Sequence, residues 1–127
     1  MTYNIAIQEK QRYIEVKVSG ERIRGQEAKD ALDMWRVVAE KCNDTGMSRV
    51  LVIFSLTGTP PIISAYDVAS SPEQVGWSRM FKTAIVDLNE ESRQINLFGE
   101  TVAVNRGFSQ TKVFDNENKA VEWLLES

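Results

Sequence analysis

Apolar and polar residues alternate along two short stretches near the start of the chain, Asn4–Glu9 and Tyr13–Ser19. Alternation with a period of two is typical of strands that bury one face. Only the polar residues 10–12 separate the two stretches. We therefore predict an antiparallel hairpin whose second strand is ended by Gly20.

Two later stretches are apolar without interruption. Val50–Phe54 holds five apolar residues in a row, and Thr83–Asp87 holds three. Unbroken runs rich in β-branched residues suit strands that are buried on both faces in a parallel sheet. Lys112–Phe114 is predicted to form a short strand at an edge of the same sheet.

Apolar residues recur every three or four positions between these strands, as they do in amphipathic helices. The clearest helix is predicted from Gln26 to about Asn43, with Gly46 as its end signal and Asp30 off its apolar stripe. That stripe consists of Ala28, Ala31, Leu32, Trp35, Val38, Ala39 and Cys42. Cap and start signals predict a helical turn at Ser64–Ala69, a helix from Pro72 to about Phe81, a helix capped by Asn89, and a last helix capped by Asp115 or Asn116.

The predicted elements follow the order β-β-α-β-α-β-α-β-α. A helix between two strands makes a crossover that requires the strands to pair in parallel. We therefore predict an α/β fold with a mixed, mostly parallel five-stranded sheet and flanking helices, in a single domain that spans residues 1–127. A chain of this length can bury roughly two-thirds of its unfolded surface, which is enough for a core without disulfide bonds.

The composition argues against several classes of function. The net charge is −3 and no dense run of Lys or Arg occurs, so nucleic-acid binding is disfavoured. The chain has no histidine and one cysteine, Cys42, and so lacks the most common general base and transition-metal ligand. We predict no enzyme activity, no metal and no cofactor. No apolar run approaches the roughly 20 residues of a membrane span and no signal-peptide pattern occurs, so a cytoplasmic protein without a membrane span is predicted.

Hydroxyl groups gather in the loop that follows the central strand. Ligands and partners of open α/β sheets meet the carboxyl ends of the strands, so the working surface is predicted here. The candidate phospho-acceptors are Ser55, Thr57, Thr59 and Ser64. Turn and cap chemistry uses the same residue types, and this alternative stays open. Asp87, Glu90 and Glu91 follow the next strand, where helix-start electrostatics explain them as well as a magnesium site does.

The last third of the chain carries segments that resemble a known family. Residues 84–87 read Ala-Ile-Val-Asp, residues 98–107 read Phe-Gly-Glu-Thr-Val-Ala-Val-Asn-Arg-Gly, and residues 120–124 read Ala-Val-Glu-Trp-Leu. These segments resemble the SpoIIAA-like, STAS-related family of small bacterial proteins, and the order of elements extends the resemblance to the whole chain. The resemblance implies a sheet flanked by helices without catalytic machinery. The better-understood relatives are anti-sigma-factor antagonists with a phosphorylatable Ser, in an Asp-Ser setting, after the central strand. This chain has hydroxyls in that loop and no Asp-Ser pair.

Two functional hypotheses follow from the residues and the resemblance. The first is a non-enzymatic STAS-like module that binds a protein partner in bacterial signalling. The second is a carrier of a small apolar or anionic ligand, for example a lipid, because other relatives resemble SEC14-type lipid-binding domains. Its apolar pocket is predicted between the sheet and a helix near residues 62–81, among Ile62, Ile63, Tyr66, Trp77 and Phe81.

The surface predicted to meet the partner or ligand spans the loop and the following segment. It consists of Thr57, Gly58, Thr59, Ser64, Tyr66, Asp67, Trp77 and Phe81. Aromatic residues and Met are enriched in the cores of interfaces, so Trp77, Met80 and Phe81 also predict a homodimer. Ordinary burial in the protein core is the alternative for the same three residues, and it stays open.

Overall fold

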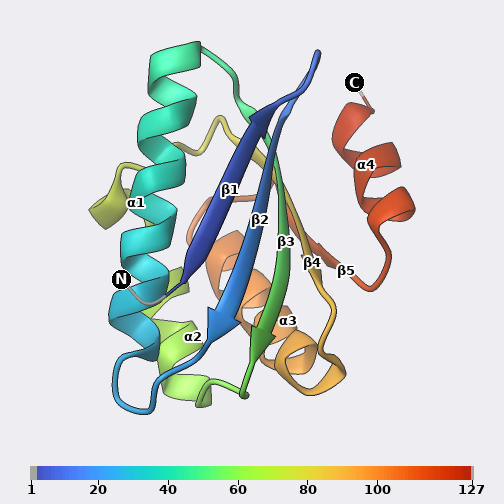
Figure 1. The fold of residues 1–127 in the computed structure, drawn as a ribbon. Helices are drawn as coiled ribbons and strands as arrows, with labels where there is room; N and C mark the ends of the chain where they lie inside the picture. The colour runs from blue at the N-terminus through green and yellow to red at the C-terminus, as the bar shows by residue number, and fades with distance from the viewer. Residues whose placement is uncertain (1–2, 127) are drawn as a thin grey trace.

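The computed structural model describes residues 3–126, and this part of the chain forms five strands, four α-helices and one 3₁₀ turn (Figure 1). In chain order these are β1 (Asn4–Glu9), β2 (Ile14–Glu21), α1 (Glu27–Thr45), β3 (Arg49–Thr57), α2 (Ile62–Ala69), η1 (Pro72–Val75), β4 (Lys82–Asp87), α3 (Glu90–Asn105), β5 (Thr111–Phe114) and α4 (Glu117–Leu125). The predicted order of strands and helices is confirmed.

The strands form one sheet in the order β1-β2-β3-β4-β5, so each strand lies beside its neighbour in sequence. β1 and β2 pair antiparallel, and the other three pairs are parallel. Figure 1 shows α1, α2 and α3 on one side of the sheet and α4 on the other. The predicted mixed, mostly parallel five-stranded sheet with flanking helices is therefore confirmed. Because β2, β3 and β4 run in the same direction, their carboxyl ends share one edge of the sheet.

β3 is the centre of the core, as its unbroken apolar run predicts. Val50, Val52 and Phe54 belong to the cluster that faces α1 and α3, whereas Leu51 and Ile53 belong to a second cluster with α4. All five side chains are at most 7% exposed. Successive side chains on a strand point to opposite faces, so a strand covered on both faces needs apolar residues at every position.

α1 agrees with its predicted bounds within two residues and ends at Gly46, which adopts the left-handed conformation (φ 76°). Its buried stripe lies slightly to one side of the predicted one. Asp30, predicted to lie off the stripe, is 2% exposed, and Trp35, predicted to lie on it, is only half-buried. The Asp30 carboxyl lies near the phenol of Tyr3, whose pKa is raised by burial and further by Asp30.

Two predicted boundaries were wrong. The second strand does not end at Gly20, because Gly20 pairs with Leu56 and β2 continues to Glu21. The helix predicted from Pro72 to about Phe81 is the single 3₁₀ turn η1, which Gly76 ends in the left-handed conformation (φ 83°). A residue in that conformation cannot continue a right-handed helix, so the capping signal at Ser71 and Pro72 starts only one turn.

Candidate functional site

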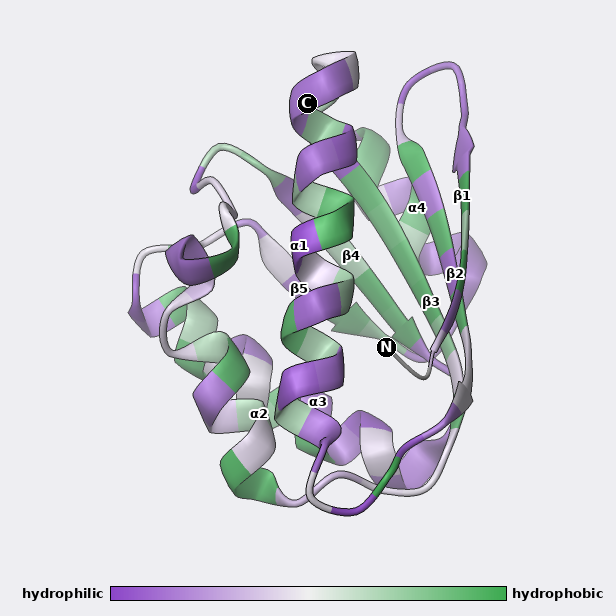
Figure 2. Cartoon of the chain, turned by 60° about the vertical axis from the view of Figure 1, so that its left-hand side comes forward, coloured by the Kyte–Doolittle hydropathy of each residue, from purple (hydrophilic) through white to green (hydrophobic). Residues whose placement is uncertain are grey.

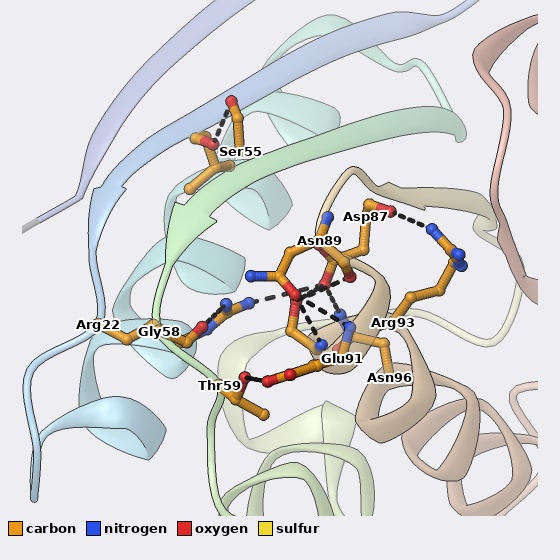
Figure 3. A network of polar contacts seen from close by, with 11 residues as sticks. Arg22, Ser55, Gly58, Thr59, Asp87, Asn89, Glu91, Arg93 and Asn96 are labelled. Carbon is orange, nitrogen blue, oxygen red and sulfur yellow. Dashed lines mark hydrogen bonds and ion pairs between the residues drawn. The ribbon is translucent and has the colours of Figure 1, made fainter.

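Asp87, the last residue of β4, is fully buried at the carboxyl edge of the sheet (Figure 3). Its carboxylate accepts hydrogen bonds from Ser92 Oγ at 2.6 Å, from Asn96 Nδ2 at 2.7 Å and from the backbone N–H of Asn89 at 3.0 Å. Asn89 in turn caps α3 by accepting from the backbone N–H groups of Glu91 and Ser92, as predicted. The carboxylate therefore holds the start of α3 against the sheet. Glu90 and Glu91 are exposed and do not join it.

Arg22, the residue directly after β2, completes this cluster. Its guanidinium lies 3.8 Å from the Asp87 carboxylate, with 7% of the Arg22 side chain exposed. It also donates to the carbonyl of Gly58 at 2.7 Å, while its backbone N–H donates to the carbonyl of Thr57. The ion pair thus ties the ends of β2, β3 and β4 together at one point. Because Arg22 also binds the Gly58 carbonyl, the ion pair holds the loop after β3 in place. Removing either charged side chain would leave the other charge buried without a partner, which is unfavourable.

The predicted hydroxyls occupy different positions around this edge. Thr57 Oγ1 donates to the carbonyl of Gly20 at 3.4 Å, and Thr59 Oγ1 donates to Glu91 Oε2 at 3.2 Å. Ser55, Thr57, Gly58 and Thr59 are all exposed. Ser55 lies within β3 and donates to the carbonyl of Val18, and Ser64 lies on the inner side of α2. Of the four candidate phospho-acceptors, Ser55 and Thr57 therefore lie within β3 and Ser64 lies in α2. Thr59 lies in the loop between them and joins it to α3.

The outer side of α2 exposes a group of large apolar residues. Ile62 is 55% exposed, Ile63 60% and Tyr66 40%, and together with Phe98 of α3 they line a shallow hollow. We call these four residues the α2 patch. Figure 2 shows hydrophobic segments on α2 at the outside of the molecule. The neighbouring Asp67 is exposed as well. Single exposed apolar residues are common on protein surfaces, whereas a contiguous group of them often marks a site of contact with another molecule.

Trp77 and Phe81 are buried, as the alternative of ordinary core packing predicts, and do not lie on an exposed surface. They are 8% and 9% exposed, and their rings pack edge-to-face with centroids 5.0 Å apart. Trp77 also packs edge-to-face on Trp35 of α1, again at 5.0 Å. These two aromatic residues belong to the core and are not presented to a protein partner. Of the three residues that predict a homodimer, only Met80 is exposed (76%). The two buried aromatic residues therefore do not support a dimer interface, and the homodimer stays a prediction.

A cavity of about 130 Å³ lies between the sheet and the helices α1, α2 and α3. Its position matches the pocket predicted near residues 62–81, and Trp77 lines it. Ile62, Ile63, Tyr66 and Phe81 do not, because the first three face outward and Phe81 packs on Trp77. Apolar residues make up most of the wall, and they include Leu32, Trp35, Phe54, Leu56, Val68, Val75, Trp77, Ile85 and Phe108.

α2 separates the cavity from the α2 patch. Ser64, Ala65, Val68 and Ala69 on its inner side line the cavity, and the patch residues occupy its outer side. α2 packs on α3 through small residues, since a Cβ added at Gly99 would lie 3.9 Å from the Cβ atoms of both Ala65 and Ala69. Among the described residues of α2 itself, none is fully buried.

The described residues give no sign of a metal centre or a membrane span. No group of three or more Cys, Asp or Glu side chains within residues 3–126 is arranged to hold a metal ion. Across the same residues, no helix is both long and apolar enough to cross a membrane.

Stability is expected to change little between about pH 6 and 8, because the chain has no histidine. It should fall above pH 9, because burial raises the pKa of Cys42 from its usual 9.0 to about 11. In that interval the unfolded chain releases the thiol proton and the folded protein keeps it, so unfolding becomes easier by up to about 1.4 kcal/mol per pH unit. Urea midpoints measured across this range check the expectation.

The variant Cys42→Ala is the control for this pH dependence. It should lose the part of the decline that belongs to the thiol. An equally steep fall in Cys42→Ala would assign the decline to other groups, such as Tyr3 and Tyr13, whose pKa values burial also raises.

Comparison with known proteins shows the fold. No known protein-family profile matches the chain, and no curated protein sequence matches it. The crystal structure of an anti-sigma factor antagonist from Mycobacterium paratuberculosis superposes with a TM-score of 0.67, over 98% of this chain and 96% of that chain, at 12% sequence identity. The protein therefore has the α/β fold of an anti-sigma factor antagonist, and the predicted SpoIIAA-like, STAS-like fold is confirmed.

Proposed function

We propose that this protein is a non-enzymatic STAS-like regulatory module of bacterial signalling that binds a protein partner at the carboxyl edge of the sheet. A solved structure that shares its fold is an anti-sigma factor antagonist, a regulatory protein by its name. The shared fold supports this class of protein, and the reason to expect a bound partner comes from the residues at the site.

The α2 patch is the observation that carries this proposal. Ile62 and Ile63 are each more than half exposed, next to Tyr66 and the loop Thr57–Thr59. Because Ile62 and Ile63 are 55% and 60% exposed, each forgoes roughly half of the 1.5–3 kcal/mol that full burial of such a side chain contributes. A protein partner that covers the patch recovers part of this free energy.

The charges near the patch indicate the chemistry of the partner. Asp67 on α2, and Glu90 and Glu91 at the start of α3, are all exposed carboxylates. One exposed cation, Arg106, also lies at the patch and donates a hydrogen bond to the Tyr66 hydroxyl, so the three carboxylates outnumber it. We propose a protein partner that presents apolar side chains flanked by basic ones, because complementary charges steer association and fix orientation.

Replacing Ile62 and Ile63 together with Ser is expected to weaken the partner complex tenfold or more and to leave the fold intact. Central apolar residues of an interface contribute most of its affinity, whereas exposed side chains contribute little to folding. Affinity purification from the host, with each captured protein quantified against the parent, identifies the partner. Titration with that purified partner then measures the affinity.

Met80→Ser is the matched control, because Met80 is 76% exposed and precedes β4 at the opposite edge of the sheet. It removes an exposed apolar side chain of similar size away from the patch. We expect it to bind the partner as the parent does. If the Ile62, Ile63 double variant kept full affinity for every captured partner, the proposed surface would be wrong.

The cavity favours a second function, the binding of a small ligand. It lies between the sheet and α2, the position predicted for a carrier of a small apolar or anionic ligand, and its wall is mainly apolar. We propose this function beside the first, since the cavity and the α2 patch occupy opposite sides of one helix.

A further inference from the structure

The hydroxyl of Thr83 in β4 is buried without a hydrogen-bond partner. Thr83 is 0% exposed, and its Oγ1 is the one buried side-chain nitrogen or oxygen atom within residues 3–126 that lacks such a partner. Buried polar groups are nearly always hydrogen-bonded, and leaving one unpaired is costly. The unpaired Thr83 hydroxyl is therefore expected to form a hydrogen bond with a molecule that enters the cavity.

Thr83 lines the cavity on the same face of β4 as Ile85. The alternate residues Ala84 and Val86 point to the opposite face, toward α4. Trp35, Trp77 and Phe54 are the aromatic residues of the wall nearest to one another, with Trp35 packing edge-to-face on both of the others. The volume of about 130 Å³ is close to the roughly 150 Å³ at which an apolar protein cavity binds benzene. One aromatic ring therefore fits.

The charged side chains of the wall already have partners within the protein. Arg22 pairs with Asp87 and binds the Gly58 carbonyl. Glu100 accepts a hydrogen bond of 2.6 Å from the backbone N–H of Val113, and Glu27 accepts one from Gly25. An anionic ligand would give up its hydration without gaining an unpaired cation, because Arg22 is already paired with Asp87, and this loss is strongly unfavourable. The mainly apolar wall and the one unpaired hydroxyl favour a neutral molecule.

We infer that the cavity binds a neutral ligand of the phenol class, with one aromatic ring and one hydrogen-bonding group. The ring lies among Trp35, Trp77 and Phe54, and the polar group forms a hydrogen bond with Thr83 Oγ1. This inference rests on the second proposed function, ligand binding in the cavity. Thr83 would therefore make the cavity bind a ligand that carries a hydroxyl more tightly than a ligand of the same shape without one.

The test compares two probes and three forms of the protein. Phenol and toluene are similar in shape, and only phenol carries the hydroxyl. Each is titrated into the parent, Thr83→Val and Thr83→Ser, with binding followed by calorimetry and by tryptophan fluorescence. The quantity of interest is the ratio of phenol affinity to toluene affinity. We expect this ratio to fall about tenfold in Thr83→Val, which removes the hydroxyl at nearly constant shape, and to be kept in Thr83→Ser.

Two other outcomes would contradict the inference about Thr83 and the proposed ligand binding separately. If both probes bind and the ratio is equal in the three proteins, the cavity binds ligands but Thr83 does not select them, and the inference is wrong while the second proposed function stands. If neither probe binds to any form, the cavity holds an ordered water at most and ligand binding itself fails. A melting temperature of Thr83→Val no lower than that of Thr83→Ser establishes that the variant is folded, since Thr83→Val removes only an unpaired hydroxyl.

Discussion

Replacing Asp87 with Ala is expected to lower the free energy of unfolding by about 3–5 kcal/mol, because it removes one partner of a buried ion pair. The Arg22 guanidinium would lose the carboxylate that lies 3.8 Å away, in a place where 7% of its side chain reaches solvent. Ser92 and Asn96 would each lose the acceptor of a short hydrogen bond. Urea unfolding followed by far-ultraviolet circular dichroism measures the loss.

Two further variants make the expectation about Asp87 specific. Asp115→Ala removes the carboxylate of a surface pair, in which Asp115 and Lys119 are 60% and 68% exposed, and its urea midpoint should match that of the parent. Adding Arg22→Met to Asp87→Ala should recover part of the lost stability, because no unpaired charge then remains. A parental midpoint for Asp87→Ala alone would show that the cluster does not hold this edge together.

Replacing Trp35 with Ala is expected to cost about 3 kcal/mol of stability. The indole packs edge-to-face on Phe54, with centroids 6.2 Å apart, and on Trp77 at 5.0 Å. Removing it loses these contacts and enlarges the cavity that it lines. Large-to-small substitutions of aromatic core residues cost about 3–5 kcal/mol, and the half-buried position of Trp35 places it at the lower end.

The control for Trp35 lies on the same helix. Val37 of α1 is 37% exposed, so Val37→Ala should change the free energy of unfolding by less than about 0.5 kcal/mol. Comparison of the two urea midpoints separates the loss of packing from any general weakening of α1. An unchanged midpoint in Trp35→Ala would mean that the side chain is not held between Phe54 and Trp77 in solution.

The sequence predicts the fold well because the fold depends on local periodicity. The unbroken run Val50–Phe54 identifies a strand covered on both faces, and the structure covers it with α1 and α3 on one side and α4 on the other. Asn89 and Gly46 act at the helix ends where their residue types predict. The predicted helix at Pro72 fails because one glycine, Gly76, outweighs a good start signal.

The candidate site was predicted less completely, because it is built from residues that are distant in sequence. The sequence predicts Asp87 at the end of a strand but does not single out Arg22, because the contact between them depends on the parallel register that aligns β2, β3 and β4. Trp77 and Phe81 carry no local sign of whether they face water or the core. Likewise, the sequence does not predict that the Thr83 hydroxyl is unpaired, because this depends on the positions of all the residues around it.

The position of α2, with the cavity on its inner side and the α2 patch on its outer side, has a thermodynamic consequence. Any molecule in the cavity and any partner on the patch act on one helix, which rests on α3 through Gly99, Ala65 and Ala69. If occupancy of the cavity changes the affinity for the partner by some factor, linkage requires the partner to change the affinity for the ligand by the same factor. Titrating the ligand with and without the partner, and the partner with and without the ligand, should therefore give the same coupling free energy. The eight-residue helix α2 would be the element that couples the two sites.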